Sequence, residues 1–91
     1  RAVTISDKVI RDAETAPRVS ATLTNTDVID LKDLKVTAVI FDTAGNAFAA
    51  SSTEIPILAP NEHRTVTFTW PEGFTRRVAR IDVLPIIAPA D

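Results

Sequence analysis

The stretch VTAVIFDTAGNAFAASS, residues 36 to 52, decides the fold, because apolar alternation on both sides of a polar corner is typical of a β-hairpin. Asp42 and Gly45 hold the first and fourth positions of that corner. A type I turn followed by a bulge favours Asp at the first position, where it caps backbone amides, and a left-handed Gly at the fourth. Counting outward from the corner predicts three pairs: Phe41 with Ala47, Ile40 with Phe48, and Ala38 with Ala50.

The same corner has an alternative interpretation as a catalytic loop. Asp-Thr-Gly is the active-site sequence of small dimeric aspartic proteases, in which two carboxylates share one proton. Here Ala44 follows Thr43, and the chain has only two glycines, Gly45 and Gly73, too few for both a tight catalytic loop and a mobile flap. The hairpin turn is therefore the favoured interpretation of Asp42, and the protease remains the alternative.

Period-two alternation recurs along the chain and predicts strands with one buried face. It is clearest in the runs 18–24, 34–40, 65–70 and 79–83, and turn-forming residues separate these runs. Only VIDLKDLK, residues 28 to 35, could form a helical turn, and it fits an irregular crossover equally well. Short strands without intervening helices predict an all-β fold, an antiparallel sandwich or barrel of six or seven strands.

The composition limits the classes of function. Ninety-one residues make one domain, 1–91, and because the chain begins at Arg1 rather than Met we expect a piece of a longer protein. A net charge of -2 gives no overall attraction to nucleic acid or anionic lipid. There is no cysteine, and no apolar run approaches the ~18 residues of a membrane span, so we expect no membrane insertion by this segment.

The predicted hairpin register leaves a small apolar patch on the face away from the core. Its members are Val39, Phe41, Ala47 and Ala49. The water-exposed face of a sheet is normally polar, so we expect this patch to contact a protein, either another domain or another subunit. The alternative is that neighbouring loops or long side chains cover it.

Other polar clusters have simpler structural explanations. His63 is the sole histidine, and Asp27, Asp30 and Asp33 lack the glycine and distal Glu of a calcium loop, so we expect neither a metal ion nor a cofactor. No serine lies in a nucleophile elbow. The basic run formed by Arg76, Arg77 and Arg80 has no interleaved aromatic residues and is typical of a charged strand edge, not of a nucleic-acid site.

A row of threonines offers an alternative function. Thr65, Thr67 and Thr69, together with Thr22 and Thr24, are predicted to share the wet face of a sheet. Such a surface would suit carbohydrate, with stacking on Trp70. Trp70 instead lies two residues after Phe68 and four after Val66, on the same face of the predicted strand, which predicts that its ring caps the core.

The stretch TNTDVIDLKDLKVTAVIFDTAGNAFAASSTEIPILAPNEHRTVTFTW resembles bacterial FxLYD-type domains, which are immunoglobulin-like (fibronectin III-like) β-sandwiches. The corresponding hairpin residues run from Ala38 to Asp42, followed by Gly45. Ala38 departs from the family, which has Phe there, and Asn61 stands where a turn glycine is common. The resemblance implies an extracytoplasmic domain of the cell envelope, often tethered by an upstream hydrophobic helix, with no catalytic residues.

Together, these observations predict an all-β, antiparallel immunoglobulin-like β-sandwich. We expect a non-catalytic structural or protein-interaction module of a bacterial cell-envelope or membrane-anchored protein. A carbohydrate-binding module is the alternative.

Overall fold

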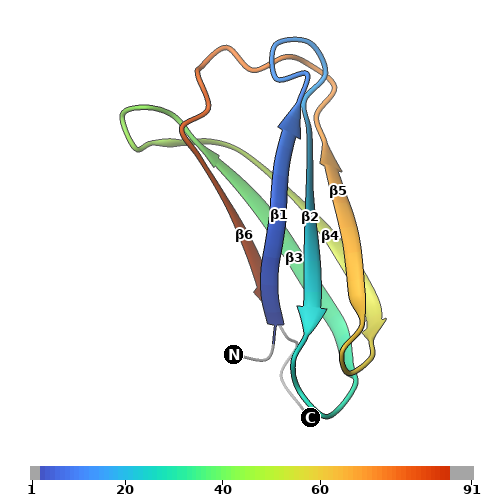
Figure 1. Cartoon of the computed structure of the whole chain (residues 1–91). Coiled ribbons are helices and arrows are strands. Elements are labelled where there is room, and N and C mark those ends of the chain that lie inside the picture. The colour runs from blue at the N-terminus through green and yellow to red at the C-terminus, as the bar shows by residue number, and fades with distance from the viewer. Residues whose placement is uncertain (1–2, 87–91) are drawn as a thin grey trace.

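The computed structural model describes residues 3–86, which form six strands in two three-stranded antiparallel sheets (Figure 1). The strands are β1 (Val3–Arg11), β2 (Arg18–Asn25), β3 (Leu31–Phe41), β4 (Ala47–Leu58), β5 (His63–Thr69) and β6 (Arg80–Ile86). Sheet A has the order β1-β2-β5, and sheet B has the order β4-β3-β6. The predicted all-β sandwich is confirmed, with six strands. The segment 28–35 forms no helical turn, because β3 begins at Leu31.

The core lies between the two sheets and follows the alternation of the sequence. Every second residue is buried from Val19 to Asn25 in β2 and from Leu34 to Ile40 in β3, and Phe68 of β5 fills the space between the sheets. Each large apolar side chain removed from water in this way contributes roughly 1.5–3 kcal/mol. The buried apolar residues of these three strands are Val19, Ala21, Leu23, Leu31, Leu34, Val36, Ala38, Ile40, Val66 and Phe68.

The register of the central hairpin differs from the predicted one by a single residue. Phe41 pairs with Ala47 as expected, but the next pair is Ile40 with Ala49, since a β-bulge intervenes. Phe48 is the extra residue, so the predicted pair of Ile40 with Phe48 is wrong. Because side chains alternate with period two, one extra residue exchanges the two faces of a strand from that point on.

Within residues 3–86, two of the three crossings between the sheets lie at one end of the sandwich. There β2 leads to β3 through residues 26–30, and β4 leads to β5 through residues 59–62. Asn61 adopts a φ of 64°, the left-handed conformation expected where a turn glycine is common. The long connection from β5 to β6 crosses the opposite end, beside the β1–β2 loop, in Figure 1.

None of residues 3–86 belongs to a helix with the length and apolarity that crossing a bilayer requires.

Candidate functional site

The Asp42 carboxylate closes the central hairpin. Its Oδ1 accepts hydrogen bonds from the backbone N–H of Ala44 at 3.0 Å and of Asn46 at 2.9 Å. Gly45 has a φ of 85° and donates its N–H to the Asp42 carbonyl at 3.0 Å, as the predicted turn requires. The Asn46 N–H, followed by that of Ala44 and by the Arg76 guanidinium, lowers the pKa of Asp42.

In an aspartic protease, two carboxylates share one proton, and their mutual repulsion raises the pKa of one of them. The environment of Asp42 has the opposite effect on its pKa. Asp42 instead forms an ion pair with Arg76 at 3.2 Å, and its side chain is only 12% exposed. The hairpin interpretation of this residue is confirmed. The Asp-Thr-small-Gly sequence therefore gives no argument for a protease.

The predicted apolar patch is smaller than expected. Val39 and Phe41 lie on the outer face of sheet B with Ala47 beside them, but Ala49 packs against the core. The placement of Ala49 on the outer face was wrong, because the bulge turns it inward. The Arg80 guanidinium lies 4.0 Å from the centroid of the Phe41 ring and covers part of what remains.

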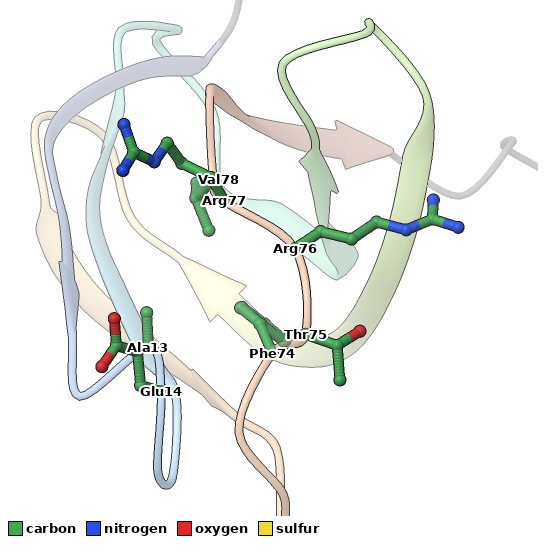
Figure 2. A pocket seen from close by; sticks show the side chains of 7 residues that line it. All are labelled: Ala13, Glu14, Phe74, Thr75, Arg76, Arg77 and Val78. Carbon is green, nitrogen blue, oxygen red and sulfur yellow. The ribbon is translucent and has the colours of Figure 1, made fainter.

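The basic run is paired within the chain. Arg76 binds Asp42, and Arg80 lies 3.2 Å from Asp82, so two of its three guanidinium groups already have carboxylate partners. Arg76 and Arg77 both line a hollow of about 370 Å³. Figure 2 shows that their side chains leave the backbone in opposite directions. The lining of this hollow comprises Ala13, Glu14, Phe74, Thr75, Arg76, Arg77 and Val78. These two guanidinium groups therefore do not converge on a common ligand.

The predicted threonine face is present on sheet A and is larger than expected. Thr22 and Thr65 are opposite each other, with their hydroxyl oxygens 3.3 Å apart, and the Thr24 hydroxyl lies 2.7 Å from Nδ1 of His63. The register adds Thr4, Ser6 and Ser20 to the same face. Among the described residues, no group of three or more His, Cys, Asp or Glu side chains could hold a metal ion.

Trp70 does not extend the threonine face. Its ring packs against the core, as predicted, and its Nε1 donates to the Ala50 carbonyl of the other sheet at 3.3 Å. A sugar resting on Thr67 therefore could not stack on this ring at the same time.

The sequence interpretation missed an exposed apolar loop at the crossing from β2 to β3. Val28 is 86% exposed and Ile29 is 60% exposed, although both belong to the residue types most often buried. Three further exposed apolar residues lie on sheet B: Ile57 pairs with Lys32 near this loop, and Ile86 and Leu84 pair with Lys35 and Thr37. The available signal was the sequence DVID, in which two adjacent large apolar residues interrupt the alternation.

Asn25 holds this loop in place. Its side chain is fully buried, and its Nδ2 donates to the carbonyls of Ile29 and Leu58, both at 2.8 Å. Its Oδ1 accepts the N–H of Asp27 at 2.8 Å, and the carboxylate of Asp27 accepts the N–H of Val28 at 2.7 Å. One buried amide thus fixes the loop to the end of β4, so the loop presents its apolar side chains in a defined position.

The comparisons with known proteins concern the fold. No family model matches the chain, and no curated protein matches it. A solved crystal structure of a DUF1425 family member from Shewanella sp. pv-4 superposes with a TM-score of 0.68 at 16% identity. The superposition covers 98% of this chain and 81% of that one. The two chains share a fold.

At that identity the likeness shows the β-rich fold alone. The FxLYD resemblance and the immunoglobulin-like class accordingly stay predictions.

Proposed function

We propose that this chain is a non-catalytic protein-interaction module of a bacterial cell-envelope protein, and that it contacts its partner through Val28 and Ile29. The observation that carries the proposal is the exposure of both side chains on a loop fixed by the buried amide of Asn25. Exposed apolar side chains on a rigid loop favour binding, because little conformational entropy is lost on association.

The free energy available at this loop suits a protein contact. Covering the exposed parts of Val28 and Ile29 would contribute about 2–4 kcal/mol of transfer free energy. Leu84 and Ile86 on β6 would add apolar area if the interface extends along sheet B. The sum is enough for two side chains to dominate an interface of ordinary size.

The charges around the loop define the partner further. Asp27 and Asp30 bracket the apolar pair. An apolar cleft with basic side chains on its rim would complement both features, whereas an anionic lipid surface would repel the carboxylates.

The cellular setting of the proposal depends on two similarities. The structural neighbour is a bacterial domain, and the resemblance to FxLYD-type domains implies display outside the cytoplasmic membrane.

Site-specific crosslinking in the native host tests the proposal. A photoreactive amino acid at Val28 of the full-length protein is expected to give a discrete protein adduct. The same group at Val9, an exposed residue on the outer face of sheet A, is the matched control. The Ile29→Ser substitution should reduce the Val28 adduct about tenfold or more and leave the melting temperature within a degree or two.

Adducts of equal yield at both positions, or an adduct insensitive to Ile29→Ser, would refute the proposed contact. An adduct with a second copy of this chain would also contradict it, and analytical ultracentrifugation distinguishes that outcome.

The hydroxyl-rich face of sheet A favours carbohydrate binding as a second candidate function. Eight Ser and Thr side chains lie there in register, namely Thr4, Ser6, Ser20, Thr22, Thr24, Thr65, Thr67 and Thr69. Glycan-array binding that is lost on Thr67→Ala would support this function. An array without signal at millimolar oligosaccharide would reject it.

A further inference from the structure

Three of the five aromatic residues gather at the end of the sandwich opposite the Val28–Ile29 loop. Phe74, in the β5–β6 connection, lies between Phe48 of β4 and Trp70, which follows β5. Its ring centroid is 5.2 Å from each of the other two, with interplanar angles of 88° to Phe48 and 66° to Trp70. Such edge-to-face contacts fix the rings relative to one another.

The bulge in the central hairpin contributes directly to this cluster. Phe48 is the extra residue that the ladder skips, so its ring meets Phe74 of the connection rather than a cross-strand partner in β3. Bulges commonly redirect a side chain in this way beside functional sites.

Backbone contacts hold the connection rigidly. The N–H of Trp70 donates to the Pro17 carbonyl at 3.1 Å, and the N–H of Phe74 donates to the Ala13 carbonyl at 2.7 Å. Gly73 packs so tightly that an added Cβ would lie 2.0 Å from the Glu14 carbonyl oxygen. The rings are thus positioned before any ligand arrives.

The three rings border an open hollow of about 300 Å³. Its lining comprises Phe48, Ala49, Trp70, Pro71, Glu72, Gly73, Phe74 and Thr75. The indole N–H of Trp70 is already bonded to Ala50, so its ring offers apolar and π surface only. The hollow combines this surface with one carboxylate, that of Glu72.

Glu72 is exposed and forms no ion pair with any residue of the described range 3–86. The nearby Arg76 is bound to Asp42, and Arg77 lines the neighbouring hollow instead. Elsewhere at this end, guanidinium groups already lie over two rings: Arg80 lies 4.0 Å from the centroid of Phe41, and Arg76 lies 5.9 Å from the centroid of Phe48. No guanidinium of residues 3–86 lies over the Trp70 or Phe74 ring in this way, and the Glu72 carboxylate beside them offers the complementary charge.

We infer that this hollow binds an arginine side chain of a protein partner. The guanidinium lies against the Trp70 and Phe74 rings, where cation–π attraction contributes, and its charge meets the Glu72 carboxylate. The site is separate from the Val28–Ile29 loop, so each can fail without the other.

Trp70 makes the test direct, because it is the only tryptophan and its indole N–H gives a single NMR resonance. The probes are acetyl-Ala-Arg-Ala-amide and the same peptide with citrulline, a neutral analogue of arginine, titrated to about 20 mM. The arginine peptide is expected to shift the Trp70 and Phe74 resonances, and the citrulline peptide to leave them in place. Glu72→Gln should weaken binding about two- to five-fold.

Glu54→Gln is the matched control, since Glu54 is an exposed carboxylate on the outer face of sheet B, opposite Lys35. It is expected to leave the affinity unchanged. Equal shifts with both peptides, no shift with either, or equal effects of the two substitutions would overturn the inference. A shift with an N-acetylglucosamine hexamer in the absence of any peptide effect would assign the hollow to glycans instead.

Discussion

Replacing Asn25 with Ala should be among the most destabilising single changes in this domain. The substitution removes two donated hydrogen bonds and one accepted bond, all of 2.8 Å. The Leu58 carbonyl is left buried without that partner, at a cost of about 1–3 kcal/mol, and the two part-buried groups lose about 1 kcal/mol each. The total of roughly 3–5 kcal/mol compares with a stability of roughly 5–14 kcal/mol for a domain of this length.

Urea unfolding followed by Trp70 fluorescence measures the loss. Asn25 ends β2, whereas Trp70 follows β5 at the end where Thr69 pairs with Arg18, so the emission of Trp70 reports global unfolding and not loosening of the loop beside Asn25. Asn46→Ala is the matched control. This exposed residue forms its hydrogen bonds in the described structure through its backbone N–H and carbonyl, which the substitution keeps. The control should lose less than about 0.5 kcal/mol.

A loss below about 1 kcal/mol for Asn25→Ala, with an unchanged m-value, would refute the argument that this amide fixes the crossing. Faster amide exchange at Asp27 provides a second readout, because that N–H loses its acceptor.

Three further predictions concern the hairpin and the aromatic end. Gly45→Ala should lower the free energy of unfolding, measured in urea, by about 1 kcal/mol, because the φ of 85° strains any residue with a Cβ. Steric contact contributes nothing to this loss, since the added Cβ would meet no atom within 4 Å. Gly73→Ala should cost at least twice that, because its Cβ would meet the Glu14 carbonyl at 2.0 Å; equal losses would contradict the close approach. The lowered pKa of Asp42 means that its ionised form stabilises the fold above the unfolded pKa of 3.8, an effect lost as the pH falls through the folded value. In Asp42→Asn, the free energy of unfolding should therefore fall less steeply at acidic pH than in the unmodified protein. Curves of equal slope for the two proteins would contradict this.

Local sequence was sufficient for the strands and for the central corner. The alternation in β2 and β3 sets which side chains face inward, and this depends only on neighbours two residues apart. The Asp42 cap and the left-handed Gly45 are also interactions within a few residues. These features could be predicted because no distant part of the chain is needed to produce them.

The register beyond the corner could not be predicted in the same way. A bulge adds one residue, and sequence alone does not say which position is skipped. Here it is Phe48, which leaves the ladder and gains the Phe74 ring, a contact between residues 26 positions apart. The interior position of Ala49 follows from that exchange of faces.

The exposed loop shows why contacts between distant residues decide which side chains stay exposed in this fold. Val28 and Ile29 are as hydrophobic as the core residue Leu31. In a mobile loop, their side chains would fold back against the apolar surface of the domain. The bonds from Asn25 to Ile29 and Leu58 prevent this, because turning the loop inward would leave the Leu58 carbonyl buried without that partner. The fold therefore leaves roughly 2–4 kcal/mol of apolar transfer free energy unused at this loop. A partner that covers the loop would gain that free energy without breaking the bonds that hold it.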